Sequence, residues 1–321
     1  LSAADITNGN INIEPTNDLG NGAHSLSTTL KDQAGNESSK SISITINVDT
    51  QTPDTSSTAP ELISDSGTSS NDNITNATSP VIKVVLGEDV KVGDTVSIYD
   101  GSTKIGTHTV TQDDLDAPKE VLISPASPLG EGEHSITSTL SNEAGNESEK
   151  SPSIDITIDS SAPDASTSTP SLEDASNTGD NSDDSTGNNT PTLVVELPNT
   201  SQVGDVIKIY DTSVTPNKVI GTHTVTADDI SGITPHKIEV SVEEPLDDGE
   251  HTLVSTISDQ AGNESAQSPS VDITIDTQGP VTPSTAPSLD ASSDTGTSNS
   301  DNITSDKTPT LNIPLDGSSQ V

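Results

Sequence analysis

Short segments in which apolar and polar residues alternate strictly run through the chain. The clearest carry Ile or Val at every second position, in residues 42–48, 154–158 and 271–275. Alternation with a period of two is typical of a β-strand with one buried face. Clusters of Gly, Pro, Asn and Asp separate these segments, and none of the segments has a helical period. The pattern therefore predicts an all-β chain.

The alternating segments belong to a unit that repeats along the sequence. The heptapeptide DQAGNES at 32–38 returns as NEAGNES at 142–148 and as DQAGNES at 259–265. Its alanine stands at positions 34, 144 and 261, so the period is 110 and then 117 residues. The segments before and after the heptapeptide repeat with it. A period near the usual size of one domain indicates a tandem array.

Each complete repeat contains about seven short candidate strands, which is the pattern of an immunoglobulin-like β-sandwich. In the second repeat we expect them at 61–63 (A), 81–86 (B), 96–99 (C), 104–111 (C′ or D), 121–124 (E), 134–140 (F) and 153–159 (G). The chain then divides into residues 1–52 with strands E to G of a first repeat, complete repeats at 53–162 and 163–279, and residues 280–321 with strands A and B of a fourth. The predicted architecture is a tandem, elongated, head-to-tail array of sandwiches, cut from a longer array.

The charge balance excludes one class of partner. The chain has 11 basic and 51 acidic residues, a net charge of −40, and every basic residue is Lys. Affinity for a phosphate backbone comes from clustered basic side chains, so we expect no nucleic-acid binding. An anionic bilayer surface repels the chain for the same reason. No apolar run approaches the length of a membrane span, and the start of the chain in mid-pattern leaves export undecided.

Two further motifs repeat with the heptapeptide. A V/I-D-T/S-x-x-P junction closes strand G at 49–53, 159–163 and 276–280, and an S-D-T-G-x-S-x-x-D-N-I-T segment follows strand A. Together these motifs resemble the bacterial immunoglobulin-like extender repeats of giant surface adhesins, the RTX or biofilm-associated adhesins exported by type I secretion. The resemblance covers the whole chain.

The resemblance implies a function in cell adhesion rather than catalysis. The chain would be a secreted stalk on the bacterial surface, the extracellular part of an adhesin anchored in the outer membrane. It would be no enzyme, and it would project a distal adhesive domain whose target lies outside this fragment. Its partners would be the neighbouring repeats of the same chain, in an array that is monomeric and makes no direct contact with the membrane.

The resemblance also implies Ca²⁺ ions that stiffen the junctions between repeats. Calcium takes about six to eight oxygen ligands, whereas zinc would want Cys, of which there is none, or paired His. In a sandwich with alternating strand directions, the A–B loop and the end of strand G face the F–G loop of the next repeat. The candidate ligands in these loops are Asp49, Asp65, Asp72, Asn142, Asn146, Asp159, Asp180, Asp184, Asp259, Asn263, Asp276, Asp294 and Asp301.

The same topology groups these candidates by junction. It places Asp49 beside Asn142 and Asn146. The next junction groups Asp65, Asp72 and Asp159 with Asp259 and Asn263. At the last junction Asp180, Asp184 and Asp276 would face a loop beyond Val321. Asn142 and Asn177 stand where other copies have Asp, which removes a charge from each loop.

A competing interpretation needs no metal. Asp, Asn and Gly are common in loops because they form turns, and the A-G-N step is compatible with a plain hairpin turn.

His24, His134 and His251 all follow a Gly-x turn at the start of strand F. No Ser or Cys nucleophile with an orienting carboxylate recurs beside them, so we expect a structural role near the E–F turn.

A rival function belongs to a different class. The repeats could themselves bind a carbohydrate or a host-surface protein through loops or an exposed sheet. Such a binder would be expected to show one divergent repeat rich in aromatic residues. The repeats are nearly identical and the chain has only two aromatic residues, Tyr99 and Tyr210. The sequence therefore favours a repeated mechanical role.

Overall fold

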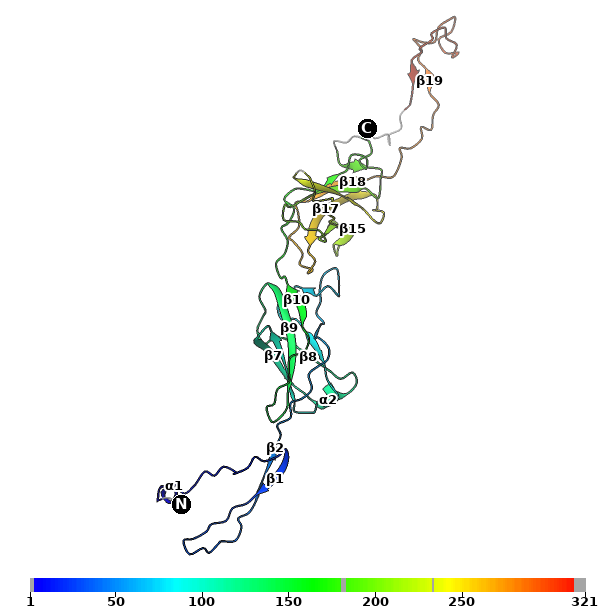
Figure 1. Cartoon of the computed structure of the whole chain (residues 1–321). Helices are drawn as coiled ribbons and strands as arrows, with labels where there is room; N and C mark the ends of the chain where they lie inside the picture. Colours follow the sequence, from blue (N-terminus) through cyan, green and yellow to red (C-terminus); the bar gives the residue numbers. More distant parts are fainter. Residues whose placement is uncertain (1–2, 180–182, 233, 315–321) are drawn as a thin grey trace. The chain divides into compact units, whose positions relative to one another are not determined.

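The computed structural model describes residues 3–179, 183–232 and 234–314, and in these residues the chain is almost entirely β (Figure 1). The chain divides into two compact units. Unit 1 contains Leu1–Pro163 and the loop Ser258–Ser265, and unit 2 contains Asp164–Ile257 and Ala266–Val321. Among the described residues no helix is long and apolar enough to cross a membrane.

Unit 1 contains the sandwich of the second repeat. One sheet has the order β3 (Glu61–Leu62), β5 (Ile82–Val85) and β8 (Glu120–Ile123). The other has the order β4 (Ile74–Thr75), β10 (Ile154–Ile158), β9 (Gly132–Ser141), β6 (Thr95–Asp100) and β7 (Thr103–Thr109). The seven expected strands A to G are all present, as β3 and β5 to β10. The structure adds β4, which runs parallel to β10 and joins the second sheet.

Unit 2 contains the sandwich of the third repeat, built in the same way. Its first sheet has the order β11 (Ser171–Leu172), β13 (Thr192–Leu197) and β16 (His236–Ser241). Its second sheet has the order β12 (Ser185–Thr186), β18 (Val271–Ile275), β17 (Gly249–Ser258), β14 (Val206–Asp211) and β15 (Lys218–Thr224). The predicted fold class, tandem immunoglobulin-like sandwiches, is confirmed.

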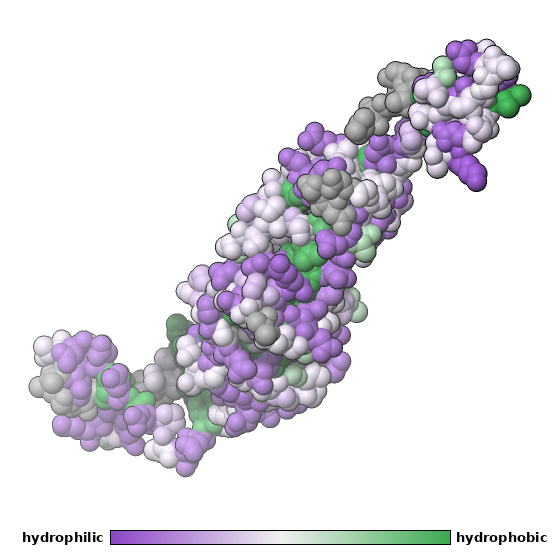
Figure 2. All heavy atoms as spheres, turned by 90° about the horizontal axis from the view of Figure 1, so that it is seen from above, coloured by the Kyte–Doolittle hydropathy of each residue, from purple (hydrophilic) through white to green (hydrophobic). Residues whose placement is uncertain are grey.

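The inner faces of the two sheets in each sandwich meet in an aliphatic core. Ile82, Ile98 and Ile136 are fully buried in unit 1, as are Leu193 and Ile207 in unit 2. Each such side chain contributes about 1.5–3 kcal/mol to folding. Figure 2 shows a face on which hydrophilic residues predominate. A chain with only 27% hydrophobic residues thus builds two cores, because those residues are concentrated on the inward positions of the strands.

One helical turn, α2 (Gln112–Leu115), follows β7 where the sequence has no helical period. The Thr111 N–H and hydroxyl both donate to Asp114 Oδ2 at 2.7 Å, and His108 Nε2 lies 2.9 Å from the same oxygen. The bond from the Thr111 hydroxyl contributes most to lowering the pKa of Asp114 to about 2, while burial opposes the shift. Asp114 therefore caps the turn.

The first repeat contains helix α1 (Ala3–Asn8) and the antiparallel strands β1 (Gly22–Leu26) and β2 (Ile44–Val48). β1 and β2 correspond to the expected strands F and G. The expected strand E is absent, because the described residues 9–21 form no strand. In the second repeat strand E pairs with strand B, and residues 1–52 contain no strand B for it to join.

The alternating isoleucines of the first repeat do not form the expected buried face. Ile42 is 97% exposed and Ile44 is 64% exposed, because residues 1–52 provide no second sheet to cover them. In the fourth repeat β19 (Ser288–Leu289) pairs antiparallel with β20 (Leu311–Asn312). These two strands stand where strands A and B were expected.

Candidate functional site

The heptapeptide forms a closed turn between strands F and G. In the third repeat Asn263 N donates to Asp259 Oδ1, and Asn263 Nδ2 donates to Asp259 Oδ2, both at 2.8 Å. Asp32 and Asn36 make the same pair of bonds in the first repeat, at 2.8 and 2.9 Å. Both carboxylate oxygens of this Asp therefore hold the turn closed. A plain turn without a metal ion is therefore enough to explain why an aspartate stands at this position.

Asn142 replaces that aspartate in the second repeat and makes additional bonds. Its Oδ1 accepts from Asn146 N and Nδ2 at 3.0 and 3.2 Å, as the aspartate oxygens do elsewhere. Its amide Nδ2 then donates to Asp49 Oδ2 at 3.2 Å and to Gln51 O at 3.0 Å. The amide thus gives the Asp49 carboxylate a direct hydrogen-bond donor.

The asparagine at the end of each A-G-N step contacts the end of a strand G. Asn146 Nδ2 donates to Asp49 O at 3.0 Å, and Asn263 Nδ2 donates to Asp159 O at 2.8 Å. Both contacts lie within unit 1. The structure therefore brings together Asp49 with Asn142 and Asn146, and Asp159 with Asn263, as the sequence predicted.

The A–B loop also meets the loop Ser258–Ser265 within unit 1. Ser66 Oγ donates to Ala261 O at 2.6 Å. Gly67, with φ of +94°, lies so close to Gln260 that a Cβ at this position would be 1.9 Å from Gln260 O. This contact requires a residue without a side chain.

One side-chain oxygen in every A–B loop is buried without a partner. Asp65 Oδ2 accepts from Asn73 N at 3.1 Å, and Asp294 Oδ2 accepts from Asn302 N at 3.1 Å. The second oxygen of each carboxylate is buried and has no donor, and the same holds for Oδ1 of Asn177 in the third repeat. Asn177 and Asp294 are only 8% and 7% exposed. Buried polar atoms are normally satisfied, so three unsatisfied acceptors at one equivalent position are an unusual feature of these loops.

The other A–B loop candidates have a local role. Asp72 Oδ1 accepts from Ile74 N at 3.1 Å, and Asp301 Oδ1 accepts from Ile303 N at 3.0 Å. In the third repeat it is Asp183, which is not among the candidate ligands, that accepts this bond from Ser185 N at 3.1 Å. Asp184 instead occupies the left-handed position, with φ of +52°, and is exposed. The sequence signal for Asp183 is that it precedes Asp184 as Asp72 precedes Asn73 in the second repeat.

Asp180 lies outside the described residues. Asp276 is exposed, and its Oδ1 accepts from Gln278 N at 3.0 Å. Among the residues that the structure describes, no three His, Cys, Asp or Glu side chains converge to hold a metal ion by themselves. Any calcium site in these loops therefore needs backbone, amide or hydroxyl oxygens in addition to carboxylates.

A second set of residues, also missed from the sequence, holds the chain that leaves strand G. Asn21 Oδ1 accepts from Thr50 N at 3.0 Å and from its hydroxyl at 2.9 Å. Asp248 Oδ1 accepts from Thr277 N at 3.0 Å and from its hydroxyl at 2.8 Å. Glu131 accepts from the backbone N–H and the hydroxyl of Ser160. We call this arrangement the exit clamp.

The exit clamp has a recognisable sequence signal. Asn21, Glu131 and Asp248 each precede the glycine that begins strand F. Each has a side chain that ends in an acceptor oxygen and is long enough to reach the residue after the strand-G aspartate. Hydrogen bonds from Thr277 lower the pKa of Asp248, and those from Ser160 lower the pKa of Glu131. The residue that leaves strand G is thus anchored without any metal.

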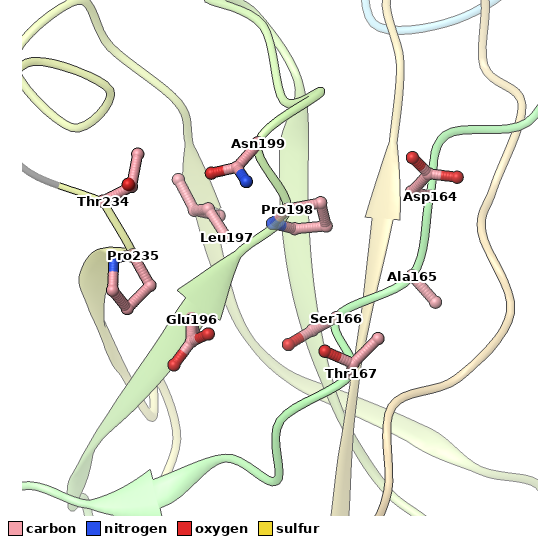
Figure 3. A pocket seen from close by; sticks show the side chains of 10 residues that line it. All are labelled: Asp164, Ala165, Ser166, Thr167, Glu196, Leu197, Pro198, Asn199, Thr234 and Pro235. Carbon is pink, nitrogen blue, oxygen red and sulfur yellow. The ribbon is translucent and has the colours of Figure 1, made fainter.

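An open hollow of about 700 Å³ lies on unit 2 (Figure 3). It lies among three segments: 164–167, the end of β13 with the loop after it, and the residues that precede β16. Its polar lining includes the carboxylates of Asp164 and Glu196, and no lining residue is aromatic or basic. The lining residues of this hollow therefore include no aromatic ring on which a sugar could stack.

Comparisons with known proteins bear on the repeats. A family model described as a bacterial Ig-like domain matches residues 1–50, 52–160 and 164–277. Among solved structures, fibronectin(III)-like modules of CbhA from Clostridium thermocellum share 16% identity at a TM-score of 0.38, over 67% of this chain and 93% of that one. A comparison with curated proteins found no match.

Two further solved structures come from bacterial adhesins. One concerns the host cell surface retention of a 1.5-MDa bacterial ice-binding adhesin, with 20% identity and a TM-score of 0.30, over 78% of this chain and 72% of that one. The other is a tetra-tandem repeat in the extending region of a large adhesion protein, with 18% identity and a TM-score of 0.24, over 85% of this chain and 60% of that one. At these identities neither structure assigns a function to the present chain.

Proposed function

The chain belongs to the bacterial Ig-like domain family, and from that premise we propose that it is an extender, the stalk of a large bacterial surface adhesin. The observation that carries the proposal is the recurrence of one set of loop bonds. Asn146 and Asn263 donate in the same way to the carbonyls of Asp49 and Asp159. When one fold and one loop contact are repeated along an array, each copy adds length without adding a new binding site. This is what a spacer requires.

Calcium is the second part of the proposal, and the A–B loop supports it best. Asp65 and Asp294 each leave a buried carboxylate oxygen without a donor. An unpaired buried polar atom is costly, and a bound cation would remove that cost. Asp65 and Asp294 would hold the ion, and Asn177 would hold it more weakly because its oxygen is uncharged. When bound, calcium would neutralise the carboxylates of these loops and stiffen the junctions.

The remaining candidates are secondary ligands in this proposal, because their side chains already take part in hydrogen bonds. These are Asp49, Asp72, Asn142, Asn146, Asp159, Asp259, Asn263, Asp276 and Asp301. Asp184 is a secondary ligand for another reason, because it is exposed.

The proposal includes a location. Calcium sites of extracellular modules have dissociation constants of about 10⁻⁴ to 10⁻³ M. Such sites are empty in the cytosol and filled outside the cell, so export can precede full ordering. We therefore propose that the chain is the extracellular part of an RTX or biofilm-type adhesin, exported by type I secretion and anchored in the outer membrane. Its role is mechanical, its partners are its own neighbouring repeats, and the adhesive target belongs to another domain.

Calorimetric titration of the full chain with calcium tests the ligand assignment. Asp65→Asn keeps the bond from Asn73 N but removes the charge, so we expect one site to weaken by about tenfold, since the charge of the ligands sets calcium affinity. Asn177→Asp adds the missing charge and should strengthen the site of the third repeat by a similar factor. Asp113→Asn, at an exposed position outside the A–B loops, is the matched control and should leave the titration unchanged.

Two results would contradict the assignment. One is the absence of any calcium binding in the unmodified chain. The other is a titration in which Asp65→Asn and Asp113→Asn behave alike.

A further inference from the structure

His134 and His251 bridge two elements at the start of strand F in the complete repeats. In unit 2, His251 Nδ1 lies 2.7 Å from Asp211 Oδ2 on β14, and its Nε2 lies 2.9 Å from the carbonyl of Asp247 in the E–F turn. In unit 1, His134 Nδ1 lies 2.8 Å from Asp100 Oδ2 on β6, and its Nε2 lies 2.9 Å from Gly130 O. Both rings therefore tie strand C to the E–F turn.

These distances determine the protonation state that fits the site. A carbonyl oxygen and a carboxylate oxygen only accept hydrogen bonds, so each ring nitrogen must carry a hydrogen. Only the imidazolium form has both. A neutral ring would place one nitrogen lone pair against an oxygen lone pair at less than 3 Å, at either end of the bridge.

The surroundings of the rings favour the positive charge. His251 and Asp211 are 8% and 2% exposed. Asp211 faces the ring from β14 and Asp247 faces it from the turn, while the residue opposite on β18 is the uncharged Ile273. Burial alone lowers the pKa of His251, but the bonds to Asp247 O and Asp211 and the two carboxylate charges outweigh it, so the pKa lies above its usual value.

The same balance holds in unit 1. Asp100 on β6 is the charged group that faces His134, the turn contributes the carbonyl of Gly130, and β10 presents the uncharged Ile156. Burial lowers the pKa of His134. The bonds to Asp100 and to Gly130 O, together with the Asp100 charge, raise it by more, so the pKa lies above its usual value.

The other histidine pair of the repeats provides an internal contrast. His108 and His223 contact Asp114 and Asp229 through Nε2, at 2.9 and 3.0 Å. For each of these rings the Nε2 contact to a carboxylate is compatible with the neutral Nε2–H tautomer.

We propose that His134 and His251 are proton-dependent braces, which make each complete repeat most stable while the ring is an imidazolium and less stable once the ring is neutral. Each complete repeat would then respond to pH above the usual pKa of histidine, independently of calcium.

The sign of the effect follows from linkage. A group whose folded pKa lies above its unfolded value, about 6.5 for His, contributes stability that is fully present below that unfolded value. The contribution is lost as pH rises through the raised, folded pKa. Each unit of pKa difference corresponds to about a tenfold change in the unfolding equilibrium constant. Carboxylates titrate at lower pH and leave this range to the histidines.

Two measurements on the full chain test the proposal. Ring ¹⁵N resonances should show both nitrogens of His134 and His251 protonated at pH 6.5, with titration midpoints above 6.5. In denaturant unfolding, the unfolding equilibrium constant of each complete repeat should rise by about tenfold as the pH is raised from 6 to 9. The His134→Gln, His251→Gln double variant should lose this pH dependence, and the matched His108→Gln, His223→Gln variant should keep it.

The result is decisive even where a histidine variant fails to fold. Asp211→Asn keeps the shape of the side chain and should lower the titration midpoint of His251 alone. Native midpoints at or below 6.5 in the unmodified chain would overturn the proposal. So would a pH dependence that persists in full when both bracing histidines are replaced.

Discussion

Gly67 and Gly179 occupy the same position in successive A–B loops, with φ of +94° and +103°. A Cβ on Gly67 would lie 1.9 Å from Gln260 O, whereas a Cβ on Gly179 would meet nothing within 4 Å. The two glycines thus share one backbone strain and differ in one contact. They form a matched pair for testing what the contact contributes.

We expect Gly67→Ala and Gly179→Ala each to cost about 1–2 kcal/mol, because a side chain disfavours the left-handed conformation. Gly67→Ala should in addition displace the loop Ser258–Ser265. Amide hydrogen exchange of Ala261 to Asn263 should therefore accelerate in Gly67→Ala and stay unchanged in Gly179→Ala. Equal exchange in both variants would show that this loop does not depend on the contact.

At the residue scale the sequence predicts neighbours better than roles. The repeat motifs place Asp49 near Asn146 and Asp159 near Asn263, and the structure brings each pair together. What these side chains do could not be read from the motif, because a carboxylate that closes a turn and one that holds an ion have the same residue type. Only burial and donor geometry separate Asp65 from Asp259.

At the scale of elements, strand alternation predicts most of the two complete sandwiches, because strands such as β5, β13 and β18 place alternate residues in the core. The unexpected elements are short: β4 and β12 have two residues each, α2 has four and α1 has six. Two residues cannot display a strand period, and a helix of four to six residues has fewer than two turns in which to display a helical one. The missing strand E of the first repeat has another cause, since an edge strand forms only where its partner strand is present.

The exit clamp belongs to this scale, since it joins the start of strand F to the chain that leaves strand G. Asp248→Ala removes the acceptor for Thr277 N and its hydroxyl, and the acceptor for Gln278 Nε2 at 3.0 Å. We expect faster hydrogen exchange at Thr277 and Gln278, because both residues lose hydrogen bonds to this carboxylate. The exposed Glu250 provides the control.

Glu250→Ala removes a carboxylate two residues from Asp248 and should leave the exchange of Thr277 and Gln278 unchanged. If both variants accelerate exchange equally, the effect is one of charge and the clamp assignment is wrong.

At the scale of the whole molecule, the net charge of −40 opposes compaction. The structure places aliphatic cores in the two complete repeats, and it leaves buried, unpaired oxygens in the A–B loops. The composition alone is close to that of disordered chains. The chain folds because the repeats concentrate its apolar residues in two cores. The unpaired oxygens are the reason that we expect calcium to bind the A–B loops and stiffen the chain.

If the chain is a spacer that calcium stiffens, its length in solution depends on the ion, and small-angle X-ray scattering of the full chain measures that length. Profiles should be compared in millimolar calcium, in chelator, and in a monovalent salt of the same ionic strength, because any salt screens exposed charges. We expect a longer, stiffer particle in calcium than in either other condition. Identical scattering in calcium and in chelator would contradict it.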